Sequence, residues 1–529
     1  MKYKSNILFF LSFICLQLLM TTGLLAQDIH LTTSDTKLSI NGQGYFSSVN
    51  VRGKELLRAG QYPLVAVCSN GKLLVPKQLI NKGKVLTWQD METNLFVHFT
   101  VNTFTDKEWG YGDEDPDVFN PTALDCRQWA KAAKEAGFKG IILTAKHHDG
   151  FCLWPSKYTE HSVKYSKWRN GQGDVLRELR KACDEYGLKM GVYLSPWDRN
   201  SAKYGTPDYI TYYRNQLKEL TTEYGDIFEV WFDGANGGDG YYGGAKEKRT
   251  IDRKTYYDWT NTRKVVRDNQ PNAVMFGDGG PDIRWVGNES GMGSTTNWCL
   301  LNADTMYAGG DYAKFLGEGQ EYGKYWVPAE VDVSIRKGWF FHENEEARTA
   351  ENILNLYYQS VGRNSNLLLN IPPNRQGLFA ENDIKSLIGF KKLLDQEFKN
   401  EVKPLKVTSG FNRGKEYAAQ NMADNNPNTY WATKDNVTTA SAEFYFGKTI
   451  EINRVLIQEY IQLGQRVKKF EVEAFVDGQW KLLTDGTTIG HKVIKKCELT
   501  KTTKIRLTIE EAKACPVISN VKFYLAPMN

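Results

Sequence analysis

The sequence lacks the signatures of several large functional classes. Its 529 residues carry 67 Lys and Arg against 62 Asp and Glu, and so small a positive excess does not indicate a nucleic-acid partner. The eight cysteines are scattered and include no Cys-x-x-Cys pair, so their spacing predicts no disulfide framework. No Gly-x-Gly-x-x-Gly directly joins a strand-like run to a helical pattern, and no Gly-x-x-x-x-Gly-Lys-Ser/Thr loop occurs. The main nucleotide-binding motifs are therefore absent.

Long apolar runs are also scarce, and the one clear example lies at the start of the chain. Lys2 and Lys4 precede a 14-residue apolar run, Ile7 to Met20, and small or apolar residues lead on to Ala26. This pattern predicts a secretory signal peptide over residues 1–26. The run is too short for a membrane anchor, so we expect an exported chain without a membrane span, in the periplasm or the extracellular space.

The rest of the chain divides into three regions that differ in their pattern of polar and apolar residues. Residues 27–88 alternate polar and apolar side chains between turn signals, which predicts a short β extension packed on the next domain. Residues 89–401 repeat a strand followed by an amphipathic helix, as in GIILTAK and then GDVLRELRKACDEYG. Such units require right-handed crossovers and a parallel sheet. Seven to eight of them in about 300 residues favour a closed (β/α) barrel over an open doubly wound sheet.

Residues 402–529 contain alternating strands without helical patterns, which predicts an all-β sandwich. The stretches AAQNMADNNPNTYWAT, INRVLIQEY and VKFYLA resemble the discoidin-like (coagulation factor type C) sandwich, which is used as a carbohydrate-binding module. The loop around Asp424 could hold a structural calcium ion through its carboxylate and nearby carbonyls, or it could be a simple turn. Both readings stay open from the sequence.

Polar and aromatic residues gather where the predicted barrel strands end, which is where (β/α) barrels form their active sites. The candidates are His98, Glu108, Trp109, His147, His148, Asp149, Tyr193, Asp233, Glu289 and Trp339. A metal site is one alternative, because Glu108, the two adjacent histidines and Asp149 are possible ligands. No His-x-His or His-Glu-x-x-His spacing supports it. We therefore expect no metal in catalysis, and imidazoles beside aromatic rings suit sugar hydroxyl groups better.

Two carboxyl groups fit the requirements of glycoside hydrolysis. Retaining enzymes need an ionised nucleophile and a protonated acid about 5 to 5.5 Å apart. Asp233 ends the apolar run IFEVWF and precedes Gly234, so it fits the nucleophile. Glu289 lies in a glycine-bounded loop after Trp285, where partial burial would raise its pKa, as an acid requires. Glu330, with Asp332 behind it, is the competing candidate for the acid.

Several motifs then match a known family. The runs FVHFTVNTFTDKEWG, AKHHDGFCLWPSKYTEHSV, GVYLSPWD, EVWFDGANG and SVGRNSNLLLNIPP resemble the retaining α-L-fucosidases of glycoside hydrolase family twenty-nine. The resemblance implies a barrel that cleaves terminal α-L-fucose from oligosaccharides or glycoconjugates through a glycosyl-aspartate, with Asp233 as nucleophile. Other residues match family positions that line the fucose pocket: His98, Glu108, Trp109, His147, His148, Tyr193 and Trp231.

A second pair of motifs bears on linkage preference. DIRWVGNESG and EVDVSIRKGWFFH resemble the subfamily that prefers α-1,3- and α-1,4-linked fucose on branched, Lewis-type glycans, which implies Glu289 as acid/base. We expect Trp339 to bind substrate, and Trp298 and Trp326 to contact the second sugar. The alternatives are a broad-specificity α-L-fucosidase, a non-catalytic sugar-binding barrel, and a metal-dependent isomerase or aldolase on the same fold. The oligomeric state is not predicted.

Overall fold

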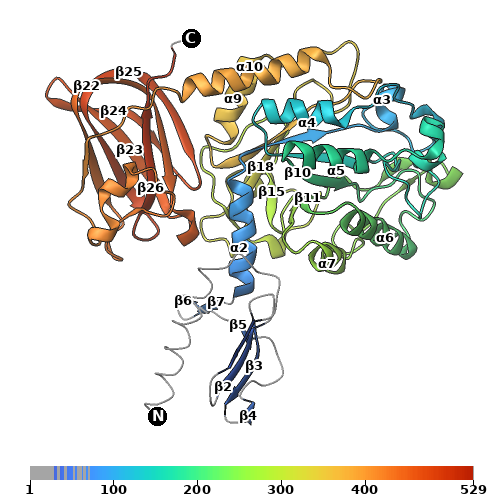
Figure 1. Ribbon diagram of the computed structural model, residues 1–529, viewed down its shortest axis with the longest axis horizontal. Coiled ribbons are helices and arrows are strands. Elements are labelled where there is room, and N and C mark those ends of the chain that lie inside the picture. The colour runs from blue at the N-terminus through green and yellow to red at the C-terminus, as the bar shows by residue number, and fades with distance from the viewer. Residues whose placement is uncertain are drawn as a thin grey trace. The chain divides into compact units, whose positions relative to one another are not determined.

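The structure is a computed structural model that describes residues 76–527 and, before them, seven short strands (Figure 1). The chain forms two compact units, residues 1–83 and residues 84–529. The predicted signal peptide lies outside the described residues. In the part of the chain that is described, no helix combines the length and apolar character needed to cross a membrane.

The first unit contains the short strands expected from its alternating pattern. They are β1 (Ile29–Thr32), β2 (Thr36–Ile40), β3 (Tyr45–Val51), β4 (Lys54–Glu55), β5 (Tyr62–Pro63), β6 (Val67–Ser69) and β7 (Lys72–Leu74). The first five form one antiparallel sheet and the last two a hairpin.

The expectation of strands up to residue 88 is wrong for the last part of this segment, which is the helix α2 (Pro76–Gln89). Proline at the first helical position is compatible with a helix start, and Lys, Gln and Leu are good helix formers. Val85 and Trp88, three residues apart, are both buried, as expected for one face of a helix.

Eight parallel strands close into a barrel, as predicted. They are β8 (Thr93–Val97), β9 (Gly140–Lys146), β10 (Lys189–Leu194), β11 (Ile227–Trp231), β14 (Val274–Gly277), β15 (Ile283–Trp285), β18 (Ala329–Ser334) and β19 (Ser365–Asn370). The ring closes where β19 pairs with β8. The sequence pattern identified seven of these strands. It missed β15, because this strand is three residues long and follows β14 without an intervening helix.

Helices pack around the outside of the barrel (Figure 1). The longer ones are α4 (Cys126–Glu135), α5 (Val175–Tyr186), α6 (Pro207–Glu223), α7 (Trp259–Asn269), α9 (Ala350–Ser360) and α10 (Glu381–Glu397). In α5 the Asp174 side chain accepts a hydrogen bond from the backbone N–H of Arg177, and Gly187 ends the helix with a φ of 64°. These are standard caps for the two ends of a helix.

The loops at the strand ends contain small elements of their own. They are α3 (Val101–Thr105), α8 (Ala313–Glu318), and the hairpins β12 (Gly238–Gly240) with β13 (Glu247–Arg249) and β16 (Leu300–Leu301) with β17 (Tyr325–Trp326). The barrel interior holds a separate apolar cluster that includes Trp88, Phe96, Tyr193, Trp231 and Phe276. Three of its members, Phe96, Trp231 and Phe276, also line the pocket described below.

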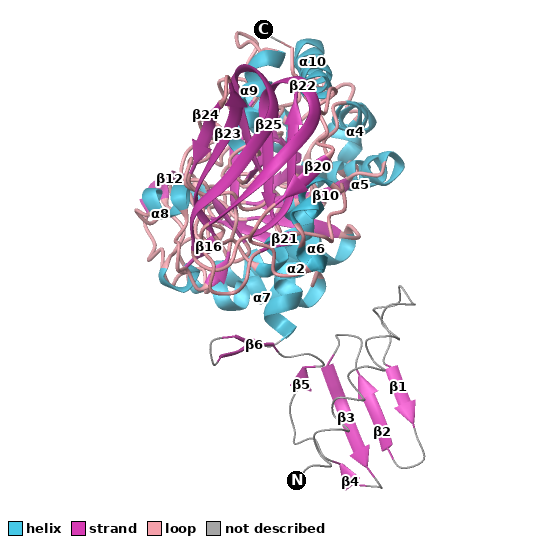
Figure 2. Cartoon of the chain, turned by 90° about the vertical axis from the view of Figure 1, so that its left-hand side faces the viewer, coloured by secondary structure: helices cyan, strands magenta, loops and turns pink. Residues whose placement is uncertain are grey.

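The C-terminal region is antiparallel and all-β, as predicted (Figure 2). Its strands are β20 (Lys406–Thr408), β21 (Trp431–Ala432), β22 (Ala440–Glu459), β23 (Val467–Val476), β24 (Gln479–Gly486), β25 (Val493–Ala512) and β26 (Val517–Tyr524). Along the first half of β22, buried and partly exposed residues alternate, because successive side chains point to opposite faces of a sheet. The inward side chains form a core separate from that of the barrel.

The barrel and the C-terminal β-domain belong to the same compact unit and share contacts. Arg454 of β22 forms an ion pair with Glu397 of α10, with a 2.7 Å separation. Leu456, Ile494 and Tyr524 of the β-domain join the core cluster of the barrel. The β-domain is therefore part of the packing of the barrel as well as a neighbour of it.

Candidate active site

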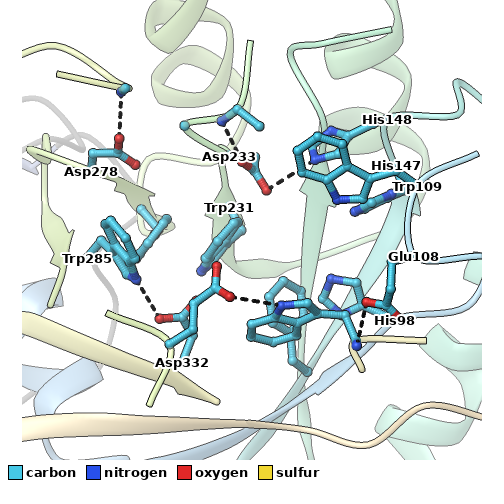
Figure 3. A pocket seen from close by; sticks show the side chains of 17 residues that line it. His98, Glu108, Trp109, His147, His148, Trp231, Asp233, Asp278, Trp285 and Asp332 are labelled. Atoms are coloured by element: carbon cyan, nitrogen blue, oxygen red, sulfur yellow. Dashed lines mark hydrogen bonds and ion pairs between the residues drawn. The ribbon is translucent and has the colours of Figure 1, made fainter. Parts of the chain in front are cut away.

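A pocket of about 290 Å³ opens at the carboxyl ends of the barrel strands (Figure 3). Both carboxyl groups assigned to catalysis, Asp233 and Glu289, line it, together with the residues expected in the fucose pocket except Tyr193, which donates a hydrogen bond to Asp233. Asp149 and Glu330 do not line it. The lining residues are Phe96, His98, Glu108, Trp109, His147, His148, Trp231, Asp233, Gly234, Ala235, Phe276, Asp278, Trp285, Glu289, Gly309, Asp332 and Trp339. Residues far apart in the sequence thus meet at one end of the barrel.

Asp233 follows β11 and is held by two hydrogen-bond donors. Tyr193 donates its hydroxyl to Oδ2 at 3.0 Å, and the backbone N–H of Ala235 donates to Oδ1 at 2.7 Å. Burial, and next the charge of Asp233, raise the pKa of Tyr193 well above its ordinary value, so the phenol remains a donor. A Cβ on Gly234 would collide with the Asp278 carboxyl. Glycine at position 234 therefore allows the Asp278 carboxyl to lie against the backbone next to Asp233.

Burial lowers the pKa of the three histidines that line the pocket, His98, His147 and His148, and thus favours their neutral forms. Burial lowers the pKa of His98 to about 3 and that of His148 below its ordinary value. Asn370 uses its amide N–H groups on Ser334 Oγ and the Trp339 carbonyl, so its Oδ1 accepts from His98 Nδ1, 2.9 Å away. With Nδ1 protonated, Nε2 of His98 carries the lone pair.

The tautomer of His148 is set in the same way. The Ser195 hydroxyl donates to the Trp197 carbonyl at 2.7 Å, so it accepts from His148 Nδ1, also 2.7 Å away. Nε2 of His148 is then an acceptor, 3.9 Å from Asp233 Oδ2. His147, whose pKa burial lowers far below its ordinary value, lies beside it, with the two ring centres 4.1 Å apart. Both line the pocket because β9 ends at Lys146 and the chain turns there.

Metal binding was the alternative for these side chains. Among the residues that the structure describes, no group of three or more His, Cys, Asp or Glu side chains is arranged to hold a metal ion. The Asp424 carboxylate in the β-domain accepts hydrogen bonds from the Asn426 N–H at 2.8 Å and the Thr429 hydroxyl at 2.7 Å. The first of these bonds is the contact of an Asx turn.

Glu108 joins two loops of the rim. Its carboxylate accepts the backbone N–H groups of Trp339 at 2.8 Å and Phe340 at 3.1 Å, and it contacts His342 Nε2 at 2.7 Å. Burial lowers the pKa of His342, but its hydrogen bonds to Asp106 and Glu108 outweigh this and raise the pKa overall. The sequence did not identify His342. The contacts orient Trp339, whose ring lies 5.0 Å from that of His98.

The two competing glutamates occupy different places. Glu289 follows β15 and lines the pocket, where its Oε2 accepts the Trp339 indole N–H at 3.2 Å. Desolvation, and next the charges of Asp233 and Glu108, raise its pKa, while the indole hydrogen bond opposes them. Glu330 is fully buried and does not line the pocket; it accepts the Trp231 indole N–H instead. The geometry favours Glu289 as the residue that meets substrate.

Two further carboxyl groups of the pocket were not proposed as site residues. Burial raises the pKa of Asp278 to about 6, and its carboxyl accepts the Gly309 N–H at 2.7 Å. Burial also raises the pKa of Asp332 well above its ordinary value, and this residue accepts the Trp285 indole N–H at 2.8 Å. Asp278 could have been found, because it follows β14 as Asp233 follows β11.

Neither Trp298 nor Trp326, which we expect to contact a second sugar, lines the pocket. Trp298 is buried, and Lys513 of the β-domain lies over its ring. Trp326 donates its indole N–H to Gln89 at the end of α2. Their positions in loops of the barrel suggested the rim, but the β-domain and α2 occupy the space around them.

Comparisons with known proteins identify the families of the two domains. The family model for "Alpha-L-fucosidase" matches residues 71–397, and that for the "F5/8 type C domain" matches residues 406–520. "Alpha-L-fucosidase 1" of Arabidopsis thaliana is 42% identical over 449 residues, covering 83% of this chain and 86% of the relative. "Putative alpha-L-fucosidase 1" of Oryza sativa subsp. japonica is 42% identical over 440 residues, covering 82% and 83%.

Solved structures are similar over most of the chain. A glycoside hydrolase 29 family member from an unknown rumen bacterium has a TM-score of 0.75 at 48% identity, covering 84% of this chain and 77% of that one. A glycoside hydrolase 29 fucosidase of Ruminococcus gnavus in complex with fucose has a TM-score of 0.75 at 34% identity, covering 84% and 94%. With its barrel, its pocket and these matches, the chain belongs to the α-L-fucosidases of glycoside hydrolase family 29.

Proposed function

We propose that this α-L-fucosidase is an exo-acting enzyme that works with retention of configuration, with Asp233 as nucleophile and Glu289 as acid/base. The observation that carries the proposal is the unequal setting of two carboxyl groups in one pocket. Asp233 is held by donors from Tyr193 and Ala235, which suit an anion. Glu289 has a raised pKa, which suits an acid. Such a division of environment assigns the two roles of a glycosidase pair.

The proposed reaction has two steps. Asp233 attacks the anomeric carbon of fucose while Glu289 protonates the departing glycosidic oxygen, which leaves a fucosyl-aspartate. Glu289, now ionised, takes a proton from water, and that water displaces Asp233. The Nε2 acceptors of His98 and His148 bind sugar hydroxyl groups, and the indole rings of the wall contact the apolar face of the ring. The relative from Ruminococcus gnavus was solved with fucose, which supports a sugar in this place.

The stereochemistry of the first product tests the mechanism. Proton NMR of a fresh reaction should show the α-anomer of fucose before mutarotation, and a β-anomer appearing first would overturn the assignment. The Asp233→Asn variant should lose at least about a thousandfold in kcat, because no covalent intermediate can form. Retained fucose binding by this variant, measured by calorimetry, is the control for an intact pocket.

We further propose a preference for α-1,3- and α-1,4-linked fucose on branched, Lewis-type glycans over a broad specificity. The support is the motif DIRWVGNESG, which carries Glu289. A branched substrate places a second sugar beside fucose, and its binding energy can lower the transition-state barrier. We expect kcat/KM for a Lewis-type trisaccharide to exceed that for α-1,2-linked fucosyllactose by at least about tenfold, or about 1.4 kcal/mol. Equal values would indicate the broad-specificity alternative.

Two proposals concern the protein outside the reaction. Lys2, Lys4 and the apolar run after them support export with cleavage after Ala26, in which case the secreted protein begins at Gln27. Catalysis is proposed to need no metal. A calcium ion at the Asp424 loop would act on stability alone, so a chelator would lower Tm without changing kcat.

A further inference from the structure

Two glutamates lie inside the barrel below the pocket. Glu229 is on β11 and Glu330 on β18, and both are fully buried. Trp88 of α2 donates its indole N–H to Glu229 Oε2 at 2.8 Å, and Trp231 donates to Glu330 Oε1 at 3.0 Å. The remaining oxygens, Glu229 Oε1 and Glu330 Oε2, are buried and accept no hydrogen bond from the described residues. The two carboxyl groups are close enough for each to shift the pKa of the other.

The number of protons follows from this arrangement. Two ionised carboxylates in contact inside a protein would repel each other, and burial penalises each charge. Two neutral acids would leave one hydroxyl without an acceptor, because the indole N–H groups already occupy the outer oxygens. One proton between Glu229 Oε1 and Glu330 Oε2 satisfies both inner oxygens. Burial, and then the neighbouring carboxyl, raise the pKa of Glu330 well above its ordinary value, in the direction that this state requires.

We propose that Glu229 and Glu330 share one proton as an acid–carboxylate pair and act as positioning residues that hold Trp231 in the wall of the sugar pocket. This inference rests on the α-L-fucosidase activity but not on the assignment of Asp233 and Glu289. Trp231 lines the pocket and precedes the proposed nucleophile by two residues.

The orientation of the Trp231 indole depends on its hydrogen bond to Glu330. The indole stacks on Phe276 with ring centres 3.9 Å apart and planes 5° apart. Stacking alone lets a ring slide or turn in its plane, whereas a hydrogen bond from the indole nitrogen to a fixed carboxyl sets its orientation. The neighbouring wall residue Trp285 is held in the same way by Asp332, at 2.8 Å. Because side chains two apart on a strand share a face, Glu330 and Asp332 supply these contacts from successive layers of β18.

The pair is not suited to the other roles open to buried carboxyl groups. A hard divalent cation takes six to eight oxygen ligands, whereas only two oxygens of this pair are without a hydrogen-bond donor. Glu330 does not line the pocket, so it is placed to act on substrate only through Trp231. These points separate a positioning role from a metal site and from a catalytic acid.

Paired variants of Glu330 test the proposal. Glu330→Gln keeps an oxygen for the Trp231 indole and carries an N–H where the shared proton lay, so kcat, KM and the Kd for L-fucose should stay within about threefold of wild type. Glu330→Met removes the acceptor, so we expect kcat/KM on an aryl α-L-fucoside to fall at least about tenfold and the Kd for L-fucose to rise. Trp88→Phe removes the other indole N–H, away from the pocket, and is the matched control, with kinetic constants within about threefold.

A double-variant cycle shows whether the effect passes through Trp231. In a Trp231→Phe background no indole N–H remains, so adding Glu330→Met should change kcat/KM by less than about threefold. A full Glu330→Met effect in that background would overturn the proposal. Loss of activity in Glu330→Gln that azide restores would also overturn it, because that is the behaviour of a catalytic acid/base.

Infrared spectroscopy tests the shared proton without activity and also applies if Glu330→Met does not fold. The difference spectrum of wild type minus the Glu229→Gln/Glu330→Gln variant, at neutral pH, should contain the carbonyl band of one protonated carboxyl group together with carboxylate bands. Carboxylate bands alone would mean two ionised groups and would contradict the proposal. A fucosidase mechanism different from the one proposed above would leave this spectrum unchanged.

Discussion

Glu289 lies on an exposed loop, yet its carboxyl group faces the pocket beside the Trp339 indole. Its pKa is raised above that of an ordinary glutamate, first by desolvation and then by the charges of Asp233 and Glu108. An acid must carry its proton to act, so the raised pKa extends the pH range in which this residue can protonate a leaving group. The same loop position leaves room for the departing glycan.

The raised pKa of Glu289 predicts how activity depends on pH in the wild type and in a Glu289 variant. In the wild type, kcat/KM should fall as pH rises through the raised pKa, because the ionised residue cannot donate a proton. In Glu289→Ala this alkaline limb should disappear on an aryl fucoside whose leaving group departs unprotonated. Azide should restore turnover and yield α-fucosyl azide, because it displaces Asp233 from the fucosyl-enzyme in the place of water. Initial rates against pH and the product anomer check both points, and azide rescue of Glu330→Ala in place of Glu289→Ala would reverse the assignment.

Among the secondary-structure elements, α10 and β22 are joined by a largely buried ion pair. Arg454 Nε lies 2.7 Å from Glu397 Oε2 and 2.9 Å from the Tyr358 hydroxyl. Only 11% of the Arg454 side chain and 3% of the Glu397 side chain are exposed. A pair so removed from water stabilises little by itself, but breaking it leaves one charge buried and unpaired.

Single and double variants of this pair should therefore differ in stability. Arg454→Met should lower the free energy of unfolding by about 3 to 5 kcal/mol, because Glu397 would keep a buried, unpaired charge. Arg454→Met combined with Glu397→Leu should recover much of that loss. Denaturant unfolding of the three proteins measures the difference. A double variant less stable than Arg454→Met would contradict this account.

For the whole molecule, the β-domain contributes to the barrel but not to the pocket. Leu456, Ile494 and Tyr524 belong to the core cluster of the barrel, and Lys492 pairs with Glu92 just before β8. No residue of the β-domain lines the pocket. We therefore expect the β-domain to affect the stability of the barrel and not the reaction in the pocket.

A chain that ends at Glu401 should show this separation. Its barrel would expose apolar surface that the β-domain covers, and each fully exposed large apolar side chain costs roughly 1.5 to 3 kcal/mol. We expect a lower Tm and a lower soluble yield, with kcat on an aryl fucoside per folded molecule close to that of the full chain. Calorimetry and active-site titration provide the two measurements. An unchanged Tm would show that the shared core contributes no stability.

The spacing of apolar residues and the order of strands and helices along the chain were enough to predict the barrel. Apolar strands followed by amphipathic helices predicted the closed barrel, since parallel strands with helical crossovers have few other arrangements. His98, His147 and Asp233 could be placed at one rim because the carboxyl ends of parallel strands meet there. The strand β15 was missed, since three residues without a helix before them leave no period to detect.

The sequence by itself thus determined the barrel, the all-β C-terminal domain and the group of residues at the strand ends. The family resemblance already implied Glu289 as the acid/base, but only the tertiary structure showed that Glu289 lines the pocket and Glu330 does not, brought Asp278 and Asp332 into the pocket, and placed Trp298 and Trp326 outside it. Glu289 and Glu330 both lie near strand ends in the sequence. They differ in burial, because other parts of the chain cover Glu330 completely and leave Glu289 exposed. Burial, and with it pKa and access to substrate, is set by contacts between residues that are far apart in the chain.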